Sequence, residues 1–113
     1  MLALQKRDFQ KIILFVLAVA IVYYIKISLM FFVLFIVWIF ASSLMYFAEH
    51  EAQPDTFGSI PSSMWWGIIT LTTIGYGDTY PVTTAGKMIG TGVAILGIAV
   101  YAIPAGIMAS AFT

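Results

Sequence analysis

The segment from Ile12 to Ala48 is almost wholly apolar and is broken mainly by Lys26. No glycine or proline interrupts it, so we expect helix throughout. The whole chain is 62% hydrophobic and 9% charged, whereas soluble domains carry about a quarter charged residues. A soluble fold of 113 residues could not bury so much apolar surface. The sequence therefore predicts an all-α integral membrane protein in contact with lipid.

Composition excludes several other kinds of function. The chain has no cysteine, which excludes disulfides and thiolate metal sites. Its formal net charge of zero gives no attraction toward nucleic acid. Every acidic residue lies in a loop or near a terminus, so no membrane-embedded carboxylate supports an enzyme or a transporter subunit. The apolar run is too long for a signal peptide and lacks a cleavage site, so we expect no cleavable leader.

The long apolar segment is more than one membrane span. Residues Ile27–Ala48 would make about 33 Å of helix, which is enough for one crossing. Residues Ile12–Ile25 would make about 21 Å, which is too short for another crossing. This stretch also lacks the polar face of an interfacial helix. It could extend the first span or pack on a neighbouring subunit, while Lys26 is expected to snorkel to the membrane surface.

A short helix and an irregular stretch follow the first span. Ser59-Ile60-Pro61 predicts a helix start, since proline is well placed in a first turn. The residues up to Thr73 continue this helix for about three turns, which indicates a re-entrant half-helix rather than a span. Residues 74–81 cannot be helical, because glycines alternate there and a proline closes the stretch. Ala85–Phe112 then forms a second span that is free of charge after Lys87.

The irregular stretch carries the chemistry of the chain. Its core is Thr-Thr-Ile-Gly-Tyr-Gly-Asp at residues 72–78. Non-helical backbone at membrane depth is tolerated only where protein covers it or it lines a water-filled path. Because glycine accepts left-handed angles, alternating Gly75 and Gly77 can turn successive carbonyl groups to one side. Such a row of carbonyl oxygens can replace the hydration shell of a cation. One loop cannot encircle an ion, so several chains must assemble.

The charged residues predict an orientation. Lys6, Arg7 and Lys11 precede the first span and favour a cytoplasmic N-terminus. Two spans would return the C-terminus to the cytoplasm, and we expect the plasma membrane as the location. Acidic residues of the outer loop, including Glu49 and Glu51, would then raise the cation concentration at the outer mouth.

The stretch Thr-Ile-Gly-Tyr-Gly-Asp at 73–78 resembles the filter of potassium channels. The similarity is wider and covers roughly Ser28 to Thr113 of the pore domain of voltage-gated potassium channels. It rests on Tyr46-Phe47-Ala48-Glu49, Ser59-Ile60-Pro61, Trp65-Trp66, Tyr80-Pro81-Val82-Thr83, Gly86-Lys87 and Ala94-Ile95-Leu96-Gly97.

The resemblance implies a homotetramer with one axial pore, in which bound potassium ions are the permeant cargo. Beyond the stretch that the resemblance covers, we expect the whole chain, residues 1–113, to form one pore domain. The predicted parts are an N-terminal segment of open placement (1–26), an outer helix (27–48), an outer loop (49–60), a pore helix (61–73), a selectivity filter (73–78) and an inner helix (85–113).

The same resemblance assigns roles to the filter and its surroundings. Filter residues Thr73, Ile74, Gly75, Tyr76 and Gly77 would hold potassium, chiefly through their carbonyl groups.

Supporting side chains would lie behind the filter. Trp65, Trp66 and Tyr76 would form an aromatic cuff. The pore helix carries Ile69 where many relatives have a carboxylate, so we expect the Asp78 carboxylate to accept a hydrogen bond from the Trp65 indole.

Two further regions have expected roles. Tyr80 would ring the outer mouth and bind the blocker tetraethylammonium, although it could instead pack sideways on Pro81. On the inner helix, Gly97 serves either packing or hinging, and Tyr101 either the core or the pore lining. A bend and gate are expected at Pro104, Ala105, Gly106, Met108 and Ala109.

Passive conduction of potassium is therefore the predicted function. A membrane enzyme or transporter subunit, a structural assembly subunit and a non-selective cation channel are the alternatives. The chain has no helix with an arginine at every third position, so a voltage-sensing or regulatory domain would have to lie outside it.

Overall fold

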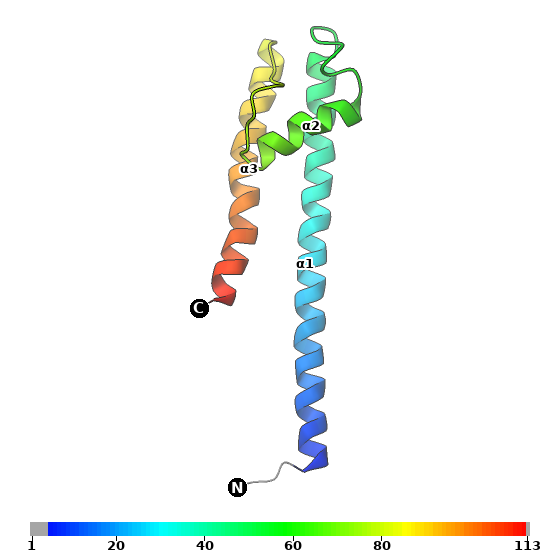
Figure 1. Cartoon of the computed structure of the whole chain (residues 1–113), viewed down its shortest axis with the longest axis vertical. Coiled ribbons are helices and arrows are strands. Elements are labelled where there is room, and N and C mark those ends of the chain that lie inside the picture. Colours follow the sequence, from blue (N-terminus) through cyan, green and yellow to red (C-terminus); the bar gives the residue numbers. More distant parts are fainter. Residues whose placement is uncertain (1–4, 113) are drawn as a thin grey trace. The chain divides into compact units, whose positions relative to one another are not determined.

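A computed structural model describes residues 5–112. Within these residues, the helices α1 (Lys6–Glu49), α2 (Ile60–Leu71) and α3 (Thr84–Ala111) follow one another (Figure 1). Helices α1 and α3 are long and apolar enough to cross a membrane. Helix α2 has 12 residues, or about 18 Å, and is too short to cross. Thr113 of the predicted inner helix and residues 1–4 of the N-terminal segment lie outside the described residues.

The chain divides into two compact parts, Met1–Val33 and Leu34–Thr113. In the described residues of the first part, the backbone is helical from Lys6 onward, as the absence of glycine and proline predicts. Asp8 lies in the first turn of α1, where a negative charge is favourable beside the free N–H groups of the helix. All side chains from Ile12 to Ile25 are exposed.

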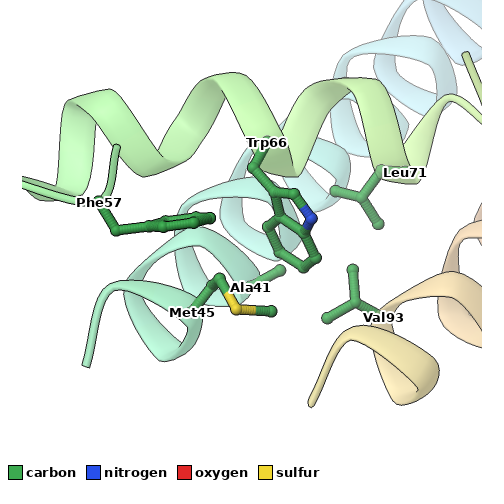
Figure 2. Close-up of a cluster of buried hydrophobic side chains, with 6 residues drawn as sticks. All are labelled: Ala41, Met45, Phe57, Trp66, Leu71 and Val93. Carbon is green, nitrogen blue, oxygen red and sulfur yellow. The ribbon is translucent and has the colours of Figure 1, made fainter. Parts of the chain in front are cut away.

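The second part has one small apolar core. It contains Ala41 and Met45 from α1, Phe57 from the loop after α1, Trp66 and Leu71 from α2, and Val93 from α3. Figure 2 shows the Trp66 indole among these side chains. Burial of Phe57, at 0% exposure, fastens an otherwise polar loop to the helices. The core therefore places the short helix α2 against both long helices.

Helix α2 begins directly after Ser59, where the sequence predicts a helix start. The Ser59 hydroxyl accepts a hydrogen bond from the Ser62 N–H at 3.1 Å, and the Ser62 hydroxyl accepts one from the Ser59 N–H at 3.0 Å. Two free N–H groups of the helix start are thereby satisfied. Pro61 follows in the first turn, as expected. The helix starts at Ile60 and ends at Leu71, two residues before the predicted end at 73.

Small residues allow α2 to approach both neighbours closely. A Cβ atom at Gly67 would lie 2.2 Å from the Ser42 hydroxyl oxygen on α1. The Trp38 indole beside it donates a hydrogen bond to the Met64 carbonyl at 2.8 Å. On the other side, a Cβ atom at Gly97 would lie 3.0 Å from the Leu71 carbonyl oxygen. Of the two expected roles for Gly97, packing therefore has a specific contact behind it.

The carboxylate of Glu49 joins the end of α1 to the segment before α3. Glu49 is fully buried, at 0% exposure. Its Oε1 atom accepts hydrogen bonds from the Thr83 N–H at 2.9 Å and the Thr83 hydroxyl at 2.6 Å. The Val82 N–H donates to both carboxylate oxygens at 3.1 Å, and the Gln53 amide donates to Oε2 at 2.8 Å.

A Cβ atom at Gly86 would lie 1.9 Å from Oε1, so only glycine leaves room for the carboxylate. The expectation that Glu49 attracts cations at an outer mouth is therefore wrong, because its charge is buried and bonded internally. Glu51, by contrast, is exposed.

We predict that Glu49→Ala lowers the free energy of unfolding by about 3 kcal/mol, because several partly buried donors lose a buried, charged acceptor. Thermal unfolding of the purified protein in detergent measures this. The matched control is Glu51→Ala, an exposed carboxylate two residues away, for which a change within about 0.5 kcal/mol is expected. Equal stability of the two variants would contradict the structural role of Glu49.

Candidate functional site

The candidate site is the stretch that follows α2, where left-handed backbone alternates with other conformations. The φ angles of Thr73, Gly75 and Gly77 are 62°, 58° and 81°. The two glycines were expected to adopt such angles. Thr73 was not, because its branched side chain resists positive φ, and the conformation is strained. Three left-handed residues at every second position thus set the course of the backbone through the site.

Hydrogen bonds hold the first half of this stretch to the end of α2. The Thr73 N–H donates to the Thr70 carbonyl at 3.1 Å, and the Gly75 N–H donates to the Ile69 carbonyl at 2.9 Å. The Thr73 hydroxyl donates to the Thr72 carbonyl at 2.6 Å. These bonds use carbonyl groups that the last turn of a helix leaves free. They also fix the strained residue in place, which sequence reasoning did not anticipate.

Behind the stretch, an aromatic side chain contacts two of its residues. The Trp65 indole N–H donates to the Asp78 carboxylate at 2.7 Å, which confirms the predicted hydrogen bond. The Trp65 ring stacks on the Tyr76 ring with centroids 5.8 Å apart and planes 4° from parallel. Trp66 lies instead in the buried core, at 3% exposure (Figure 2). Within one chain, the expected cuff therefore consists of Trp65 and Tyr76.

The second half of the stretch leads to the Glu49 carboxylate. Tyr80 has an exposed ring, at 60%, and its carbonyl accepts a hydrogen bond from the Gln53 amide at 2.9 Å. Gln53 also binds Glu49, so one side chain joins the two. Neither Gln53 nor Phe57 was picked out from the sequence. The one sequence signal that could have indicated Phe57 is that it is a single aromatic residue in a polar loop.

The candidate gate residues lie together on the last third of α3. Pro104 falls inside the helix and is half-buried. Tyr101, Ala105, Gly106, Met108 and Ala109 are all exposed in the single chain. These residues of α3 are therefore not covered by the rest of the described chain.

Comparison with known proteins identifies a family. The family model described as an ion channel matches residues 32–113. Potassium voltage-gated channel subfamily KQT member 4 of Homo sapiens is 55% identical over 78 residues, which are 69% of this chain and 11% of that protein. A candidate potassium channel protein of Rhodopseudomonas palustris is 47% identical over 73 residues, or 65% of this chain and 18% of that protein. Potassium voltage-gated channel subfamily A member 6 of Homo sapiens is 44% identical over 87 residues, which are 77% of this chain and 16% of that protein.

The chain belongs to the ion channel family. This family comprises channels rather than enzymes, and the two long apolar helices of the chain make it an integral membrane protein. The resemblance to voltage-gated potassium channels is confirmed by the relatives. The chain spans only about a tenth to a fifth of the length of these proteins. The match begins near the first residue of the second compact part, Leu34, and leaves residues 1–31 of the ion channel chain unmatched.

We predict that Trp65→Phe and Asp78→Ala destabilise the ion channel chain by one shared interaction. Phenylalanine keeps an aromatic ring beside Tyr76 but loses the N–H donor, and alanine removes the carboxylate acceptor of Asp78. A double-mutant cycle on thermal stability should give a coupling free energy of about 1–2 kcal/mol. Simple additivity of the two changes would mean that the hydrogen bond does not contribute.

Proposed function

We propose that this chain forms a potassium-selective pore that conducts potassium passively across a membrane. The observation that carries the proposal is the left-handed backbone at Thr73, Gly75 and Gly77, directly after the short helix α2. Left-handed residues at every second position are suited to turning successive carbonyl groups toward one side. The carbonyl groups of residues 73–77 and the Thr73 hydroxyl would then replace the hydration shell of the ion.

Four copies of the chain would enclose the path as a homotetramer. The side chains of Ile74 and Tyr76 are 54% and 66% exposed in the single chain, although this stretch requires a cover at membrane depth. Neighbouring subunits can supply that cover. In this arrangement α2 is a re-entrant pore helix whose C-terminal end, with its partial negative charge, points toward the ion.

Potassium is favoured over other cations by the intact filter sequence and by the relatives, which are named as potassium channels. A non-selective pore is the nearest alternative, and we expect such a pore to depart from Gly75-Tyr76-Gly77. Because several relatives are named as voltage-gated channels, we propose that a voltage-sensing or regulatory domain works with this chain from outside it.

The lower part of α3 is proposed as the gate. Pro104 lacks a backbone N–H and Gly106 adds freedom, so the helix can bend there. In a tetramer, four α3 helices would bring together apolar faces that contain Ala105, Met108 and Ala109. Such a narrow apolar constriction would close the pore by excluding water. The basic N-terminal residues favour both termini on the cytoplasmic side of the plasma membrane.

Gly77→Ala is predicted to abolish potassium selectivity or conduction. No atom lies within 4 Å of the position that a Cβ would take at Gly77 in the single chain, so only its φ of 81° opposes alanine there. The measurement is the reversal potential of reconstituted channels between potassium and sodium solutions.

Gly92→Ala is the matched control, since a Cβ atom at Gly92 would also lie more than 4 Å from other parts of the chain, but Gly92 is helical. It should leave selectivity intact. An unchanged reversal potential in Gly77→Ala would contradict the proposed filter.

Tyr80→Val is predicted to weaken block by external tetraethylammonium while selectivity is kept. Aromatic rings attract quaternary ammonium ions, and a loss of about 1 kcal/mol reduces affinity about fivefold. Tyr80→Phe retains the ring and should retain the block. If Tyr80→Val is blocked as well as the unchanged protein, Tyr80 packs sideways and does not face the entrance.

A further inference from the structure

The N-terminal part of α1 has a surface that the pore does not explain. Every side chain from Ile12 to Ile25 is exposed, and the large apolar ones range from 39% exposure at Val19 to 73% at Tyr24. The segment lies in the first compact part and outside the ion channel match, which begins at residue 32. What surrounds these side chains in the membrane must therefore be inferred from the residues of the segment itself.

The distribution of side chains around this helix identifies these surroundings. Successive residues of an α-helix are about 100° apart, so Ile12, Ile13, Leu14 and Phe15 alone already surround the axis. The following residues are equally apolar up to two tyrosines at 23 and 24. A helix that docks on one protein groove keeps a polar face toward water, whereas one that is apolar all round is enclosed on every side. Lipid hydrocarbon provides such an enclosure without any specific partner.

The ends of the segment match the two zones of a membrane surface. Lys6, Arg7 and Lys11 precede it and suit the anionic head groups of lipids. Tyr23 and Tyr24 lie near its C-terminal end and Lys26 follows it, and residues of both types reach from apolar surroundings to a polar surface. The charged residues thus lie at its two ends and none lies within it.

We propose that residues Ile12–Ile25 are embedded in the hydrocarbon of the bilayer, with lipid on all sides. The segment continues α1 without a break, and residues 27–48 of that helix already make about 33 Å, which is enough to cross a hydrocarbon layer of about 30 Å. The further length of about 21 Å therefore lies oblique to the membrane normal within one leaflet. The long Lys26 side chain extends to the head groups. This proposal is independent of which ion the pore conducts.

Site-directed spin labelling tests the proposal directly, because the chain has no cysteine and each introduced thiol is unique. Single cysteines replace the five consecutive residues Leu14–Ala18, and the labelled full-length protein is placed in lipid nanodiscs. Collision rates with oxygen, which concentrates in hydrocarbon, are compared with those of a water-soluble nickel complex. If lipid surrounds the helix on all sides, the collision rate with oxygen should exceed that with the nickel complex at all five positions. The two rates should also show no helical periodicity along the segment. Glu51→Cys in the exposed outer loop is the water reference and should show the reverse.

Two other patterns would overturn the proposal. Protection from both reagents at positions three or four residues apart would mean that one face packs on protein, including a second copy of this chain. Nickel accessibility equal to that of the Glu51→Cys reference would mean that the segment is in water.

Thiol reactivity gives a second measurement that needs no spin label. A charged maleimide reacts with the thiolate, and apolar surroundings raise the pKa of a thiol, so Leu17→Cys should react more slowly than Glu51→Cys by about tenfold or more. Both faces of a nanodisc are open to the reagent. Unfolding in detergent should equalise the two rates and show that both thiols are intact. Equal rates in the nanodisc would refute burial in lipid.

Discussion

The structure of residues Leu34–Thr113 depends on the hydrogen bonds that the buried carboxylate of Glu49 accepts. This carboxylate receives hydrogen bonds from the backbone of Val82 and Thr83, only a few residues after the candidate filter. The start of the filter is held separately by carbonyl groups of α2, including that of Ile69. An irregular stretch with three left-handed residues is thereby fixed at both ends. Since such backbone has no ladder of its own, these anchors decide its conformation.

The close approach of the helices has a second physical basis, the absence of side chains at three glycines. Gly67 lets α2 reach α1, Gly97 lets α3 reach the end of α2, and Gly86 leaves space for the Glu49 carboxylate. Each position would bring a Cβ atom within 3.0 Å of an atom of another element. Backbone contact of this kind compensates for the small apolar core, because packed surfaces in lipid gain little from hydrophobic burial. Gly97 thus contributes through packing, whatever its part in gating.

Much of the fold followed from local patterns in the chain. The two spans, the start of the short helix at Ser59 and the glycine alternation were all predictable, because each reflects the solvent or the backbone of consecutive residues. The hydrogen bond between Trp65 and Asp78 also followed, from a missing partner at Ile69. The left-handed Thr73 did not, because a threonine normally avoids that conformation and only its hydrogen-bonded surroundings hold it.

The sequence by itself therefore determined the membrane class, the order of the helices and the residues of the candidate filter. Only the tertiary structure decided that Glu49 is an internal acceptor. It also decided that Trp66 belongs to the core while Trp65 contacts Tyr76 of the candidate filter. The reason is the separation of the partners. Glu49 and Val82 lie 33 residues apart, and which side chains meet over such a distance depends on how the helices cross. Periodicity and composition describe each segment alone, so they do not predict which side chains of different segments come into contact.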